Sequence, residues 1–160
     1  MIAALVLALG AVAPACYPPP VAAPIAVPFV RPACSFCPGH RGVEFYLVAG
    51  TPVRPVAPGV VTFSGVVAGT RYLVVLQPDT LRATYGMLAA TSLSSGDVVA
   101  AGQIVGYSGT RLYLGLRDAA GAPIDPTPLL GRWVGRPRLV PHDGRPARAG
   151  PPPHLACSNR

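Results

Sequence analysis

The sequence has no lysine and little charge of either sign. All 13 basic residues are arginine, and charged residues make up 12% of the 160-residue chain. Helical periodicity is also missing. Beyond the N-terminal segment, no ten-residue stretch repeats apolar residues at helical spacing. Glycine and proline are abundant instead, with 18 and 21 residues. This composition argues against long helices and predicts many short strands joined by turns.

The first 15 residues form an uncharged apolar run that ends in Ala13-Pro14-Ala15. Small residues after an apolar stretch are typical of a secretory cleavage site. The run is shorter than the roughly 20 residues that a membrane-spanning helix needs. Residues 1–15 are therefore predicted to be a signal peptide or an uncleaved apolar anchor. We expect the protein to be secreted or associated with the cell envelope, and to contact a membrane only through that anchor.

The four cysteines are consistent with an oxidising compartment. Cys34 and Cys37 are close enough in sequence to close a small ring by a disulfide, which leaves Cys16 and Cys157 as a second pair. Lipidation of Cys16 is an alternative that would leave Cys157 without a partner. A zinc site that combines the Cys-x-x-Cys motif with the histidine and glutamate after it is another alternative. One such motif is a weak zinc signal, so we favour the disulfide.

Composition divides the remaining chain into three segments. Residues 16–39 are rich in proline and predict an extended strap that offers a sheet few hydrogen bonds. Residues 40–130 are nearly neutral, since six arginines face five acids and give a net charge of +1. Residues 131–160 carry six arginines against one acid, a net charge of +5, with little apolar content. We expect this basic tail to be disordered, the alternative being a tail that binds an anionic polymer.

Seven short runs rich in Val, Leu, Tyr and Thr lie in the nearly neutral segment. Turn residues such as Pro58-Gly59 and Gly109 separate the runs. They cover residues 42–48, 60–64, 71–77, 81–87, 98–100, 104–107 and 111–117. Short strands at this spacing predict an all-β fold, an antiparallel β-sandwich or barrel-like domain.

Five motifs follow one another in a fixed order between residues 40 and 130. They are His-Arg-Gly-Val-Glu (40–44), Thr-Tyr-Gly-Met-Leu (84–88), a glycine-rich turn (96–106), Arg-Leu-Tyr-Leu-Gly-Leu-Arg (111–117) and Gly-Ala-Pro-Ile-Asp-Pro (121–126). In this order the motifs resemble the lysostaphin-type (LytM-like) zinc metallopeptidase family. The glycine-rich turn also occurs in biotinyl and lipoyl carriers, which need a modifiable lysine. The absence of lysine excludes those carriers.

The resemblance implies a zinc site built from a His-x-x-x-Asp pair and the second histidine of a His-x-His strand. Two further histidines would orient and activate water. In this chain His40 and Glu44 fall on the first pair and Tyr113 on the third ligand, while Arg111 and Met87 replace the other two histidines. A catalytic zinc needs three protein ligands and an open position for water. We therefore expect no catalytic residues here.

Two interpretations of His40 and Glu44 follow. The first makes them a weak remnant of a metal site. The second, which we favour, makes His40 a loop residue and pairs Glu44 with Arg111, while Tyr113 and Met87 fill the vacated site. Tyr113 as an anionic metal ligand is an alternative, although its reference pKa of about 10 means that a metal must already be bound to ionise it.

The favoured function is a bacterial, catalytically inactive domain that binds peptidoglycan or regulates a cell-wall hydrolase. It needs no cofactor and no nucleic acid. The first alternative is a zinc endopeptidase that cleaves peptidoglycan cross-links with altered ligands. The second is a structural module whose basic tail binds an anionic polymer.

Overall fold

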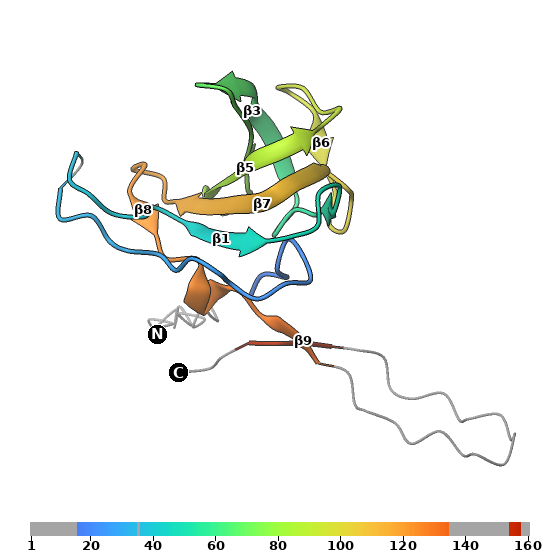
Figure 1. The fold of residues 1–160 in the computed structure, drawn as a ribbon. Coiled ribbons are helices and arrows are strands. Elements are labelled where there is room, and N and C mark those ends of the chain that lie inside the picture. Colours follow the sequence, from blue (N-terminus) through green and yellow to red (C-terminus); the bar gives the residue numbers. More distant parts are fainter. Residues whose placement is uncertain (1–15, 35, 135–153, 158–160) are drawn as a thin grey trace, which may run out of the picture.

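The computed structural model describes residues 16–34, 36–134 and 154–157 (Figure 1). The predicted signal or anchor segment and most of the basic tail lie outside the described residues. Within them the chain is almost entirely strand and loop, and the one helix is a 3₁₀ turn, η1 (Thr127–Leu129). No helix in this part of the chain is long and apolar enough to cross a membrane. The all-β prediction is confirmed.

Eight strands form a single antiparallel sheet (Figure 1). They are β1 (Val43–Tyr46), β2 (Pro52–Val53), β3 (Gly59–Val67), β4 (Thr70–Leu76), β5 (Arg82–Ala90), β6 (Val98–Val99), β7 (Gly106–Arg117) and β8 (Pro123–Ile124). The main order is β1-β7-β5-β4-β3-β6, and β2 and β8 pair with the two ends of β7. The predicted antiparallel architecture is therefore confirmed.

β7 is the longest strand, and its side chains alternate between the two faces of the sheet. Leu112, Leu114 and Leu116 are fully buried on one face, where they join the core with Phe45 and Tyr85. Because successive side chains of a strand point to opposite faces, the residues between these leucines lie on the other face. That second face carries the polar residues of the candidate site.

The prediction of a strand break at Gly109 is wrong. β7 runs through Gly109 without interruption, and it joins the runs predicted at 104–107 and 111–117 into one strand. A Cβ at Gly109 would lie 3.3 Å from the carbonyl oxygen of Met87 on β5. Glycine at this position therefore allows β5 and β7 to approach closely. The sequence alone cannot distinguish a glycine with this role from one in a turn.

Residues 16–34 of the strap run along the free edge of β1. Val27 exchanges backbone hydrogen bonds with Glu44, and Val30 exchanges them with His40. The strap also contributes to the core, because the side chains of Tyr17 and Val21 are buried in it. The sequence predicts the extended course of this segment but not its packing, because its prolines hide any regular apolar pattern.

A second, two-stranded sheet joins β9 (Arg132–Val134) to β10 (His154–Ala156). These residues belong to the segment that is predicted to lack order. Their pairing uses backbone hydrogen bonds, and Trp133 remains mostly exposed, so the ribbon needs no core of its own. The low apolar content of the tail therefore does not prevent this local pairing.

Two disulfides hold the outer segments of the chain. One joins Cys34 to Cys37, with 4.9 Å between the Cα atoms, and the other joins Cys16 to Cys157, with 5.9 Å. The second bond links the start of the strap to the end of β10. The sequence favours the first of these disulfides and leaves Cys16 and Cys157 as a possible second pair.

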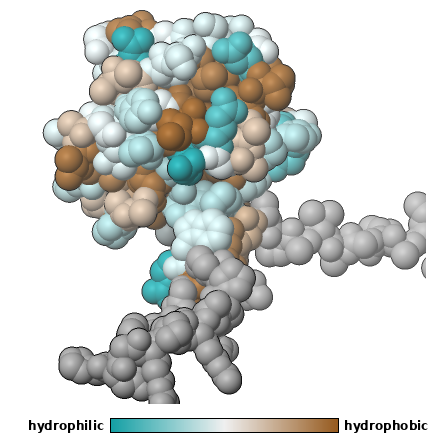
Figure 2. All heavy atoms as spheres, turned by 90° about the vertical axis from the view of Figure 1, so that its right-hand side faces the viewer, coloured by the Kyte–Doolittle hydropathy of each residue, from teal (hydrophilic) through white to brown (hydrophobic). Residues whose placement is uncertain are grey.

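Apolar side chains are not confined to the core. Val66 and Val67 on β3 and Val98 on β6 are exposed. On the face that Figure 2 shows, apolar side chains lie next to hydrophilic ones. The leucine face of β7 is thus the main buried layer, and the outer surface is mixed in character.

Candidate functional site

The register of β1 and β7 builds a polar cluster on the side of the sheet away from the leucine core. Glu44 lies directly opposite Tyr113, and Tyr46 lies opposite Arg111. Residues two apart on a strand share a face, so Glu44, Arg111 and Tyr113 project to the same side. We call this surface the Glu44 face. The structure thus brings together four of the predicted site positions, His40 among them.

Glu44 is the centre of the cluster. Its side chain is 8% exposed, and its Oε1 lies 3.1 Å from Nε2 of His40. Its Oε2 accepts a hydrogen bond from Nη2 of Arg111, so the predicted contact between Glu44 and Arg111 is confirmed. Each carboxylate oxygen therefore has a partner that donates to it.

His40 is held by acceptors on both sides of its ring. Nδ1 lies 2.9 Å from the carbonyl oxygen of Pro28 in the strap, and Nε2 faces the carboxylate of Glu44. A carbonyl or an ionised carboxylate can only accept, so each ring nitrogen must carry a proton for both bonds to form. With both bonds formed, neither ring nitrogen has a lone pair free for a metal.

Arg111 spans the open side of Glu44. Its side chain is 47% exposed, and its guanidinium carbon lies 5.6 Å from the ring centre of Tyr46. An arginine over an aromatic face gains a cation–π attraction. The guanidinium therefore has two reasons to stay beside Glu44, where it places a fixed positive charge.

Tyr113 covers two glycines on the same face. A Cβ at Gly42 would lie 2.6 Å from its ring, and one at Gly115 would lie 2.7 Å from its hydroxyl oxygen. Its ring also meets the His40 ring edge-on, with centroids 5.9 Å apart. Burial raises the pKa of Tyr113, although nearby Arg117 and Arg41 act in the opposite direction. A raised pKa opposes the phenolate form that a metal ligand would need.

Met87 lies at a bulge between β5 and β7. The register shifts between Gly86 and Leu88, and Met87 has a left-handed backbone with φ of 62°. Bulges of this kind change the direction of one side chain and are common near active sites. The bulge faces the part of β7 between Ser108 and Tyr113. The side chain of Met87 is half-buried there.

Comparison with known proteins supports the family that the motifs indicate. Residues 38–126, more than half of the chain, match the family described as Peptidase family M23. The chain belongs to peptidase family M23. Its fold and its lysostaphin-type character, both predicted from the sequence, are confirmed.

Three relatives of this M23 chain show how far the similarity extends. Glycyl-glycine endopeptidase ALE-1 of Staphylococcus capitis is 35% identical over 77 residues, which cover 46% of this chain and 21% of that protein. Lysostaphin of Staphylococcus simulans is 34% identical over 77 residues, 46% of this chain and 16% of that protein. The structure of Helicobacter pylori Csd3 aligns with a TM-score of 0.64 at 28% identity, over 72% of this chain and 33% of that chain. The chain spans less than a quarter of the length of its curated relatives.

The residues of the Glu44 face do not fit the zinc that M23 peptidases imply. A catalytic zinc needs three protein ligands, and two of the three positions here are His40 and Glu44. Glu44 is engaged by Arg111, and Tyr113 stands at the third position. Over the described ranges, no group of three or more His, Cys, Asp or Glu residues could hold a metal ion. The donor set and the adjacent guanidinium both disagree with a metal centre.

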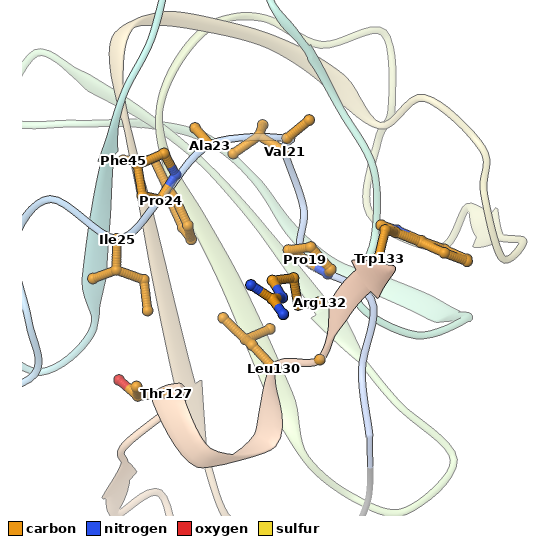
Figure 3. Close-up of a pocket in the computed structure, with 12 residues that line it drawn as sticks. Pro19, Val21, Ala23, Pro24, Ile25, Phe45, Thr127, Leu130, Arg132 and Trp133 are labelled. Carbon is orange, nitrogen blue, oxygen red and sulfur yellow. The ribbon is translucent and has the colours of Figure 1, made fainter. Parts of the chain in front are cut away.

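A separate apolar cavity of about 560 Å³ lies between the strap and the segment around η1. Val21, Ile25, Phe45 and Leu130 are among its lining residues. Figure 3 shows Ile25, Phe45 and Leu130 around the hollow, whereas the ring of Trp133 extends away from them. Phe45 follows Glu44 on β1 and therefore points to the opposite face of the sheet. This cavity is thus distinct from the Glu44 face.

Sequence reasoning missed the contributions of Pro28 and Tyr46 to the site. Pro28 acts through its backbone carbonyl, which no side-chain motif can reveal. Tyr46 lies two residues after Glu44 on β1, so strand alternation could have placed it on the same face. Its alignment with Arg111 requires the register of β1 against β7, which only the structure gives.

Proposed function

We propose that this M23 chain is an exported, non-catalytic domain of the bacterial cell envelope that binds peptidoglycan peptide or a cell-wall hydrolase. One observation carries the proposal. Glu44, which falls on the expected metal ligand, is bound on one oxygen by Arg111 and on the other by His40.

The loss of catalysis follows from the charges around Glu44. A zinc ion would have to displace a guanidinium that is hydrogen-bonded to Glu44 and stacked on Tyr46. His40 would also have to give up the contact of its Nε2 with Glu44. Hydrogen bonds between charged groups are about twice as strong as neutral ones, so both changes oppose metal binding. With Tyr113 uncharged, the two remaining ligands are too few to offset these costs.

A binding role is supported by the exposure of the same face. Tyr46 is 61% exposed, and Arg111 beside it is half-exposed. Aromatic residues and arginines are the side chains that most often dominate protein interfaces. The glycyl-glycine endopeptidase from Staphylococcus capitis acts, by its name, on a glycyl peptide. We infer that a peptide is the ligand that this face has kept.

Export is supported by the cysteines and by the leader. All four cysteines are in disulfides, which persist in oxidising compartments. The N-terminal apolar run with its small residues supplies a route to such a compartment.

The test compares metal content, binding and cleavage in one preparation. We expect the purified chain to contain far less than one zinc per molecule by mass spectrometry. We also expect it to sediment with purified peptidoglycan but to release no soluble fragments, even with added zinc. Lysostaphin under the same conditions provides the positive control for cleavage. Near-stoichiometric zinc that is lost in His40→Ala, together with cleavage, would overturn the proposal.

A zinc endopeptidase with altered ligands is the second candidate. The bond from Nδ1 of His40 to the carbonyl of Pro28 favours it, because metal-bound histidines usually donate their other nitrogen in this way. Release of fragments that depends on both zinc and His40 would establish this candidate.

A further inference from the structure

We infer that a pocket formed by three arginines next to the Glu44 face binds a carboxylate group of an anionic peptide. The pocket has a volume of about 450 Å³, and Arg31, Arg41 and Arg117 line it together with Pro32 and the turn at 120–123. We call it the arginine pocket. The choice of a peptide as ligand rests on the proposed function, whereas the preference for an anion rests on the pocket itself.

The three arginines come from separate parts of the chain. Arg31 lies in the strap, Arg41 precedes β1, and Arg117 ends β7. In the part of the chain that the structure describes, Glu44 forms its ion pairs with His40 and Arg111, and neither Arg31 nor Arg117 takes part in them. Three cationic groups therefore converge on one cavity, and no carboxylate ion-pairs with Arg31 or Arg117 there.

The contacts of Arg31 and Arg117 leave donors for a ligand. Arg117 donates from Nη1 to the carbonyl of Gly121 at 2.8 Å, and Arg31 packs over the ring of Phe29. A guanidinium has five N–H donors in a planar fork that matches a carboxylate. Both side chains are exposed, so these remaining donors are accessible from solvent.

A cross-strand pair of like charges gives a second reason to expect an anion. Arg82 on β5 lies directly opposite Arg117 on β7. Like charges in this position destabilise a sheet. An anion bound at Arg117 would offset that repulsion, so the arrangement is more favourable with a ligand than without one.

The position of the pocket favours a peptide over a phosphate polymer. The hydroxyl of Tyr113 lies over Gly115, which is two residues before Arg117 on β7. Arg117 and Arg41 are near enough to lower the pKa of Tyr113 against the larger effect of burial. The arginine pocket is thus adjacent to the Glu44 face, since Arg117 lies on the same strand and the same face as Tyr113 and Arg111. A peptide that lies on that face can place a carboxylate in the pocket.

The experiment measures binding of a soluble peptidoglycan stem peptide with free carboxylates by calorimetry. The comparison ligand is the same peptide with its carboxyl groups amidated, which removes the charge but preserves the shape. Arg117→Gln and Arg31→Gln are the test variants, since Arg117 also supports the turn at Gly121 and Arg31 does not. Arg71→Gln on β4 is the control, because it removes the same charge outside the pocket.

We expect amidation and each test variant to weaken binding about tenfold or more, as the loss of a charge-assisted hydrogen bond predicts. In the test variants, we expect amidation of the peptide to have much less effect than in the parent protein. Arg71→Gln should change affinity about twofold or less. Circular dichroism checks that each variant is folded.

The outcomes separate this inference from the proposed function. Equal binding of both peptides, or unchanged binding in both folded test variants, overturns the arginine pocket even if the protein sediments with peptidoglycan. Peptide binding that depends on Arg117, in a protein that also contains near-stoichiometric zinc and releases soluble fragments from peptidoglycan, supports the pocket and overturns the proposed non-catalytic function. Binding of poly(glycerol phosphate) but not of the peptide overturns the peptide assignment. Absence of binding to the peptide and to peptidoglycan overturns the pocket and also the peptidoglycan-binding form of the proposed function.

Discussion

Glu44 is a nearly buried carboxylate whose two side-chain partners come from different segments of the chain. His40 precedes β1 and is fixed by the strap, whereas Arg111 lies on β7. A buried charge is costly unless it is paired and hydrogen-bonded. The contacts that stabilise the cluster therefore also oppose metal binding, because they occupy both oxygens of Glu44.

Removal of Arg111 should leave the buried charge of Glu44 without its arginine partner and so destabilise the fold. We expect Arg111→Ala to lower the free energy of unfolding by roughly 1–3 kcal/mol, less than the loss of a fully buried partner because Arg111 is half-exposed. Adding Glu44→Gln should restore part of this loss, because it removes the unpaired charge. Urea denaturation of the two single variants and the double variant measures the coupling. Strictly additive effects would show that the ion pair contributes nothing.

Restoration of histidines should bring back a metal site. Tyr113 lies directly opposite Glu44, so Tyr113→His would place a third ligand across from it. Arg111→His in the same chain removes the guanidinium that repels a cation. We expect this double variant to retain close to one zinc per molecule after dialysis, measured by mass spectrometry. Arg111→Gln with Tyr113→Phe is the control. A folded double variant without zinc would show that His40 and Glu44 are not arranged as a ligand pair.

At the scale of elements, the sequence predicts strands where apolar runs are long enough to show a pattern. It places β4 within one residue at each end and finds the region of β1, β3 and β5. It predicts the contact of Glu44 with Arg111, since the motifs assign both to one former site. It cannot predict β2 or β8, which have two residues each and no pattern.

Two features are not predicted from the sequence, the contact of Pro28 with His40 and the arginine pocket. Both arise where segments that are distant in the sequence pack together. The carbonyl of Pro28 reaches His40 because the strap pairs with the edge of β1. The arginine pocket unites Arg31 and Arg117, which are 86 positions apart in the chain. Isolated arginines in a sequence give no signal of convergence. The topology of the sheet is needed to bring them together.

The strap and the β9–β10 ribbon depend on the disulfide between Cys16 and Cys157. Its 141-residue separation restricts the unfolded chain strongly, and such bonds contribute typically about 2–4 kcal/mol. We expect Cys16→Ser with Cys157→Ser to lower the free energy of unfolding by that amount. Cys34→Ser with Cys37→Ser, which opens a much smaller ring, should cost less. Equal losses in chemical denaturation would contradict the dependence on loop length.

At the scale of the whole molecule, the absence of lysine simplifies the alkaline titration. Arginine stays charged to a pH above about 12, and all four cysteines are in disulfides. Tyrosine side chains are therefore the groups that titrate between about pH 9.5 and 12. Two of them are well suited to report on folding. Tyr85 is fully buried and accepts a hydrogen bond from the backbone N–H of Val56, and Tyr17 donates to Asp79 at 2.5 Å.

Burial raises the pKa of both Tyr17 and Tyr85, and the bond to Asp79 raises that of Tyr17 further. Above about pH 10 a tyrosine in the unfolded chain loses its proton, whereas these two keep theirs in the folded protein. The unfolded state then binds fewer protons, so stability falls as pH rises, by up to about 1.4 kcal/mol per pH unit for a fully buried group. We expect urea denaturation at increasing pH to show this decline. Tyr17→Phe should make it less steep, and Tyr46→Phe, at an exposed position, serves as the control. A stability that stays constant to pH 11 would contradict the buried, protonated state of these tyrosines, because no lysine is present to mask their effect.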